Sequence, residues 1–307
     1  MILTKFALSC SDPIGNYNLA LALAHAAQLS YAKEDSDTIN DAENVESTAY
    51  QSRKLSQLEL SLASQAERVI SGSGKEFAKG WLLLALVQSF LQKSPQAAYA
   101  ACDAGLRISP QGQYETVMLY LTRASLALRE GQPTKAITPC EQALLNLAIL
   151  TPKDTTRMAS KLWIELLNIF LKLGWYDSAN TCIEKLMEFA GSGVTSYGKG
   201  LIHESKGETM EALRAYKESL LQDFRNWRCM VRAAACLLLE APDSEEARLY
   251  LRNALHMEPA SYEAWYQLGL LHKAKGEMMQ ARQALTIAIR LAAVSPAISL
   301  RILLYDD

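Results

Sequence analysis

Apolar and small residues recur along this chain at helical spacing, in segments that come in pairs. Near the C-terminus, Trp265 and Leu268 precede Gly269, and a turn at Gly276 is followed by Ala281. Residues three or four positions apart lie on one face of an α-helix. The pattern therefore predicts two amphipathic helices joined by a turn, with small residues where the two helices cross.

The same pair recurs upstream at a nearly fixed interval. Ala247 lies 34 residues before Ala281, and Gly269 maps back 35 residues to Ala234 and a further 34 to Gly200. A loop absorbs the single extra residue at little entropic cost. This interval, with Trp-x-x-Leu-Gly in the first helix and Ala-x-x-x-Leu in the second, is typical of the tetratricopeptide repeat.

The period predicts an all-α fold, a right-handed solenoid of antiparallel helix pairs. We expect residues 73–293 to form this solenoid, residues 1–72 to hold N-terminal helices with an acidic insertion at 33–48, and residues 294–307 to form a tail or capping helix. The expected pairs are, approximately, 76–92 with 95–108, 113–130 with 133–150, 156–173 with 176–189, 194–206 with 209–222, 227–240 with 244–257, and 262–275 with 278–292.

Composition narrows the class of protein further. Half of the residues are hydrophobic and 21% are charged, and 31 basic residues against 33 acidic ones give a net charge of -2. This chain folds, but it lacks the basic excess that nucleic-acid binding requires. Its longest apolar run, 81–87, is too short to span a bilayer. We therefore expect a cytoplasmic protein that reaches any membrane only through partners.

Candidate chemistry is sparse. The six cysteines are dispersed without a C-x-x-C pair, which predicts reduced, buried thiols. The segment 71–75 resembles a phosphate-binding loop but lacks its first glycine and its magnesium-binding hydroxyl. The four histidines fall on four different predicted helices, so we interpret them as packing residues. We therefore expect a protein without enzymatic activity, without a cofactor and without a metal site.

A helical solenoid offers an extended concave face for another protein chain. Its mixed character suits an amphipathic or extended partner, although every solenoid has such a face, whether used or not. When the first helices of the pairs are aligned with one another, their equivalent positions predict which residues face this concave side. These residues are Lys161, Ile164, Asn168, Lys172, Tyr197, Leu201, Arg228, Val231, Tyr266, Leu270 and Lys273.

Three stretches carry a resemblance to a known family. They are the segment from Asp12-Pro13 to Ala24, the stretch Ala-Trp-Tyr-Gln-Leu-Gly-Leu-Leu-His-Lys at 264–273, and Ser295-Pro296 after the last repeat. Together they resemble the C-terminal half of the tetratricopeptide-repeat-domain-seven proteins and, more closely, the plant no-pollen-germination proteins. Such proteins usually begin with further repeats, so we expect Met1 to open a truncated or divergent chain.

The resemblance implies a non-catalytic scaffold that holds a phosphatidylinositol 4-kinase catalytic subunit together with a hyccin-type partner near the plasma membrane. Plant members are also described as calmodulin-binding.

Two alternatives remain open. Phe224 to Leu237 is basic on one side with bulky ends, as calmodulin targets are, although packing explains the same residues. A co-chaperone module that clamps a peptide carboxylate needs Lys, Asn and Arg in its groove. The last repeat instead carries Glu263, Tyr266 and Leu270 there.

Overall fold

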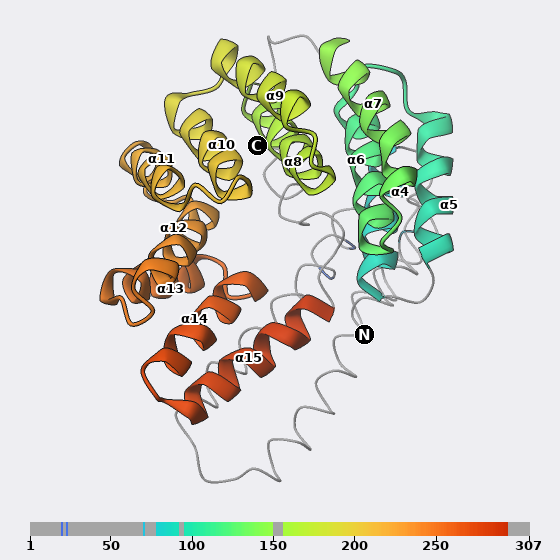
Figure 1. Ribbon diagram of the computed structural model, residues 1–307. Coiled ribbons are helices and arrows are strands. Elements are labelled where there is room, and N and C mark those ends of the chain that lie inside the picture. Colours follow the sequence, from blue (N-terminus) through green and yellow to red (C-terminus); the bar gives the residue numbers. More distant parts are fainter. Residues whose placement is uncertain are drawn as a thin grey trace, which may run out of the picture. The chain divides into compact units, whose positions relative to one another are not determined.

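The computed structural model describes residues 78–91, 95–149 and 156–293, together with Ala20, Leu23 and Ile70. In these stretches the chain forms helices joined by short turns, which confirms the all-α tetratricopeptide-repeat fold (Figure 1). The bounds lie within about two residues of those predicted. The helices are α4 (Ala78–Leu91), α5 (Pro95–Ile108), α6 (Tyr114–Arg129), α7 (Pro133–Ile149), α8 (Thr156–Leu173), α9 (Tyr176–Phe189), α10 (Ser192–Ser205), α11 (Thr209–Gln222), α12 (Trp227–Glu240), α13 (Glu245–Met257), α14 (Tyr262–Ala274) and α15 (Met278–Ala293).

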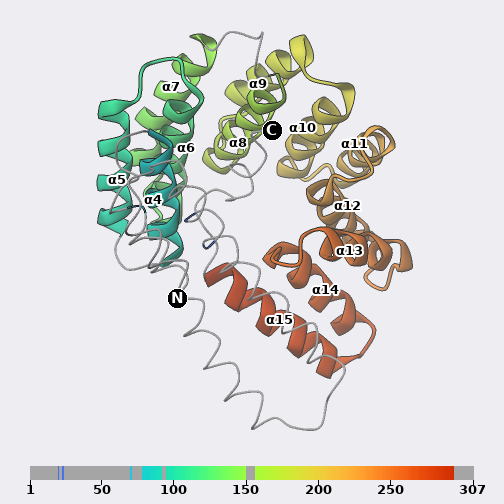
Figure 2. The same cartoon turned by 180° about the vertical axis from the view of Figure 1, so that it is seen from behind.

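These helices belong to two compact units. The N-terminal unit holds α4 to α7 and α8 as far as Ile169, and the C-terminal unit runs from Phe170 to Ala293. The pairs α4–α5 and α6–α7 pack together in the first unit, as α10–α11, α12–α13 and α14–α15 do in the second (Figures 1 and 2). The predicted N-terminal helices, acidic insertion and tail lie outside the described residues, apart from Ala20, Leu23 and Ile70, so the domain boundaries stay a prediction.

Within the C-terminal unit, successive pairs stack on one another. Helix α11 contacts α12, α13 contacts α14, and the first helices α12 and α14 also touch. The core between them consists of apolar and small side chains from three helices. Its buried members are Met230, Val231, Ala234 and Leu238 of α12, Ala247, Leu251 and Ala254 of α13, and Ala264 and Leu271 of α14.

A recurrent glycine turn connects the two helices of a pair. After α10, the backbone N–H of Gly207 donates to the carbonyl of Glu204 at 3.0 Å, and that of Glu208 donates to the carbonyl of His203 at 2.9 Å. Gly207 has a φ of 79°, which residues with a Cβ rarely adopt. The equivalent glycines, all at positive φ, are Gly131, Gly174 and Gly276.

The small residues of the repeat sit at close helix crossings, as predicted. A Cβ added to Gly200 would collide with the ring of Tyr216, and one added to Gly269 would lie 2.7 Å from Cγ of Leu285. These two contacts occupy the same position in their repeats. Ala281, on the other side of such a crossing, is only 3% exposed.

Five cysteines lie within the described residues, and all five are free and buried, which confirms the prediction for them. Burial raises their pKa values to about 12 at Cys102, Cys140, Cys182 and Cys229, and to about 11 at Cys236. They are therefore protonated at neutral pH. Cys10 is outside the described residues.

None of α4 to α15 has both the length and the apolar composition needed to span a membrane.

Candidate partner-binding surface

The predicted groove residues divide by burial. Ile164 on α8, Tyr197 and Leu201 on α10, and Val231 on α12 are between 2% and 6% exposed. These side chains are therefore buried in the fold. Burial also raises the pKa of Tyr197 above its ordinary value.

The remaining members reach the surface. On α14, Tyr266 is 48% exposed, Leu270 is half-buried and Lys273 is exposed. On α12, Arg228 is half-buried, with its guanidinium 5.5 Å from the centre of the Trp227 ring. Helices α10, α12 and α14 are the first helices of their pairs, and we call their exposed sides the first-helix face. On α8, Lys172 is exposed, and Lys161 and Asn168 are half-buried.

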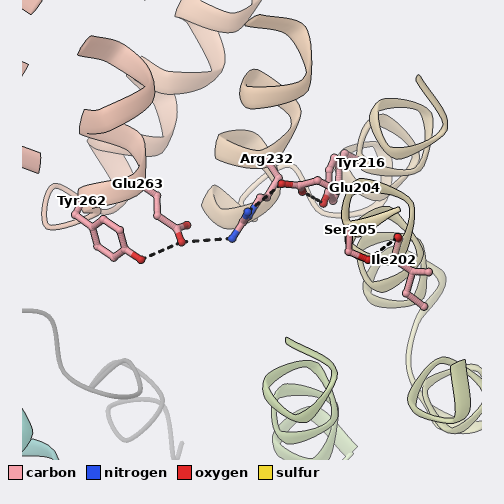
Figure 3. A network of polar contacts seen from close by, with 7 residues as sticks. All are labelled: Ile202, Glu204, Ser205, Tyr216, Arg232, Tyr262 and Glu263. Atoms are coloured by element: carbon pink, nitrogen blue, oxygen red, sulfur yellow. Dashed lines mark hydrogen bonds and ion pairs between the residues drawn. The ribbon is translucent and has the colours of Figure 1, made fainter. Parts of the chain in front are cut away.

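A polar network ties the first helices of three consecutive pairs together (Figure 3). Arg232 of α12 donates from Nη1 to Glu204 Oε1 of α10 at 3.0 Å, and from Nη2 to Glu263 Oε1 of α14 at 3.4 Å. Tyr216 of α11 donates its hydroxyl to the second oxygen of Glu204, and Tyr262 donates to Glu263 at 3.3 Å. One guanidinium thus bridges helices that are far apart in sequence.

The charged groups of this network pair with one another. Burial lowers the pKa of Arg232, but the carboxylates of Glu263 and Glu204 raise this pKa by more than burial lowers it. The pKa of Arg232 therefore lies above its ordinary value. Burial and Glu204 raise the pKa of Tyr216. Arg232 is therefore a permanent cation engaged by two carboxylates, which leaves it poorly placed to clamp a partner's carboxylate.

Sequence reasoning did not identify this network. Glu204, Arg232 and Glu263 occupy three different positions of the repeat, so no i, i+4 spacing and no fixed register marks them. Only the stacking of α10, α12 and α14 brings them together.

His203 and His272 are half-buried and have the same partner type. Nδ1 of His203 contacts Glu208 just before α11, and Nδ1 of His272 contacts Glu277 just before α15. Each imidazole therefore links the two helices of a pair across the glycine turn. The repeated spacing from His to Glu, five residues on, could have revealed this. Among the described residues no His, Cys, Asp and Glu side chains gather as a metal site would require.

The calmodulin-like segment is built into the fold. Phe224 is 68% exposed, but Met230 and Val231 are buried in the core of the C-terminal unit. A protein that wraps around this segment would have to remove α12 from that core. Removal would expose several buried apolar side chains to water, which costs free energy.

Fold and repeat together define an all-α tetratricopeptide-repeat protein, and a tetratricopeptide-repeat family model matches residues 232–296. The chain is 26% identical over 247 residues to Protein NPG1 of Arabidopsis thaliana. The aligned residues cover 75% of this chain and 35% of that protein. The chain is also 28% identical over 193 residues to Tetratricopeptide repeat protein 7A of Homo sapiens, covering 62% of this chain and 20% of that protein. The predicted family resemblance is thereby confirmed, although the chain spans only about a third or less of these relatives.

Solved structures agree on the fold. The crystal structure of Ypp1 superposes with a TM-score of 0.60 at 18% identity, covering 84% of this chain and 39% of Ypp1. A tetratricopeptide repeat protein from Parabacteroides merdae gives 0.52 at 14% identity, covering 88% of this chain and 99% of that protein. These identities establish the shared fold alone.

Proposed function

We propose that this chain is a non-catalytic adaptor that holds protein partners, and that its partners are the catalytic and hyccin-type subunits of a phosphatidylinositol 4-kinase assembly at the plasma membrane. The similarity to NPG1 and to Tetratricopeptide repeat protein 7A carries the proposal, because the family resemblance implies this assembly. The adaptor role itself also rests on the repeat fold, whose usual work is protein recognition.

The first-helix face supports binding to a protein chain. Tyr266, Leu270 and Lys273 line successive turns of α14 and offer an aromatic ring, an apolar side chain and a charge. Tyrosine is enriched among the residues that dominate interface energies. The Arg232 bridge holds the neighbouring helices in place, so a partner would find this face largely preorganised.

The described polar groups favour binding over catalysis. The buried thiols are held protonated at neutral pH, and the carboxylates around Arg232 are paired with it. A nucleophile or general base would need a free group poised near neutral pH. The co-chaperone alternative is less well supported, because Arg232 is already occupied by two carboxylates.

The proposal is tested by co-expressing the chain with the kinase and hyccin-type subunits and purifying through a tag on the kinase. A surface variant, Tyr266→Ala with Lys273→Glu, alters two exposed side chains of α14. We expect the wild type to co-purify and the variant to lose affinity by about tenfold, or about 1.4 kcal/mol.

The matched control is Met279→Ala with Arg282→Glu, which alters two exposed side chains of the second helix α15. It should bind like the wild type. Absence of any wild-type complex would refute the kinase assignment. A complex equally insensitive to both variants would place the interface away from the first-helix face.

A further inference from the structure

The turn between α11 and α12 presents large apolar side chains to solvent. Leu221, in the last turn of α11, is 85% exposed, and Phe224, in the turn itself, is 68% exposed. Their neighbours Leu220 and Trp227 pack against the core of the C-terminal unit. The exposed pair therefore contributes little to the packing of the repeats.

The backbone of this turn is held by its own hydrogen bonds. Oδ1 of Asp223 accepts from the backbone N–H of Arg225 at 3.0 Å, and Oδ1 of Asn226 accepts from the N–H of Cys229 at 3.1 Å, which caps α12. The N–H of Asp223 donates to the carbonyl of Ser219 at 3.0 Å. Phe224 is thus projected outward from an anchored backbone.

An aromatic residue here departs from the repeat. The residue that follows the C-cap of the second helix is Gly191 after α9, Phe224 after α11 and Pro259 after α13. Glycine and proline occupy this position in the neighbouring repeats, so the fold does not require a large side chain there. A local departure without a packing gain is the kind of feature that function explains.

Arginines accompany the two aromatic rings near this turn. The guanidinium of Arg225 lies 5.6 Å from the centre of the Phe224 ring, and that of Arg228 lies 5.5 Å from the centre of the Trp227 ring. Arginine and aromatic side chains together characterise the energetic centres of protein interfaces. A partner complementary to this turn would supply an acidic group for Arg225 and an apolar side chain for Leu221 and Phe224.

We propose that Leu221, Phe224 and Arg225 form a docking surface for an acidic protein segment that carries a bulky apolar side chain. The surface goes beyond the adaptor function proposed above, since it uses none of Tyr266, Leu270 and Lys273. A protein segment is favoured over a lipid surface because two arginines beside the carboxylate of Asp223 fall short of the four to eight basic residues typical of anionic-lipid binding.

The test uses a phage-displayed library of random 16-residue peptides selected on the whole chain. Selected peptides are then measured by fluorescence anisotropy against the wild type, Phe224→Ala, Arg225→Glu, and the control Leu249→Ala, which truncates another exposed leucine, on α13. Circular dichroism and thermal melting should be unchanged in each variant.

We expect selected peptides rich in Asp, Glu and bulky apolar residues, with Kd raised at least tenfold by Phe224→Ala and by Arg225→Glu but not by Leu249→Ala. Higher salt should weaken binding, because the contact pairs opposite charges. Three outcomes would overturn the proposal: no peptides sensitive to Phe224→Ala, selected peptides without acidic residues, or Phe224-dependent binding to phosphatidylserine vesicles in place of peptides.

Discussion

The spacer glycines set how closely the two helices of a pair approach. Because a methyl group on Gly200 would collide with the Tyr216 ring, we expect Gly200→Ala to lower the free energy of unfolding by about 1–3 kcal/mol. Urea denaturation measures this, and Lys199→Ala at the exposed neighbouring position should stay within about 0.5 kcal/mol of wild type. Equal midpoints for the two variants would mean that Tyr216 can move aside without cost.

The link between His272 and Glu277 should make stability depend on pH. The hydrogen bond from His272 lowers the pKa of Glu277. A carboxyl group with a lower pKa in the folded state stabilises the protein above its unfolded pKa, about 4.3, and loses that contribution as the pH falls through the folded value. Below about pH 4, the unfolding free energy of wild type should therefore fall more steeply than that of His272→Phe. Urea titrations across this range would show parallel curves if the pair contributes nothing.

At the scale of helices, Arg232 is the link that the stacking of pairs creates. Its side chain is 35% exposed, so solvent weakens both ion pairs and we expect a coupling of about 1 kcal/mol between Arg232 and Glu263. A double-mutant cycle with Arg232→Met and Glu263→Gln measures this quantity. The control pair, Lys185 and Glu188 on α9, is more exposed and should couple by only about 0.3 kcal/mol. Equal couplings for the two cycles would reduce Arg232 to an ordinary surface ion pair.

The crossing of α14 and α15 offers a second test at this scale. Ala281 is nearly fully buried at that crossing. We expect Ala281→Leu to destabilise the protein by about 1–3 kcal/mol, because the added methylene groups would force the helices apart. An unchanged melting midpoint would show that the repeat frame is misplaced in the last pair.

For the whole molecule, the buried thiols predict a protected native state. Burial raises the pKa values of five cysteines to about 11 or 12, so their reactive thiolate form is scarce at pH 8. In the variant Cys10→Ser, we expect a disulfide exchange reagent to label these cysteines rapidly in urea and slowly without it. Rapid labelling of the native variant would show that the helix pairs open often.

Much of this fold could be predicted because its signals are local. The turn glycines, such as Gly207, and the spacers, such as Gly200, fix where each helix ends and which side it packs, and both recur at a fixed interval. Helix bounds therefore followed from the sequence to within a few residues. The candidate surface could be predicted less well, since surface and core alternate within a single first helix.

The sequence by itself determined the repeat, the pairing of helices and the resemblance to tetratricopeptide-repeat proteins, because each depends on residues close together in the chain. Only the tertiary structure decided that Tyr197 and Val231 are buried while Tyr266 is exposed, that Arg232 joins three helices, and that Phe224 points outward. These outcomes depend on how one pair stacks on the next. Stacking involves side chains about thirty residues apart, whose contacts no periodic pattern records.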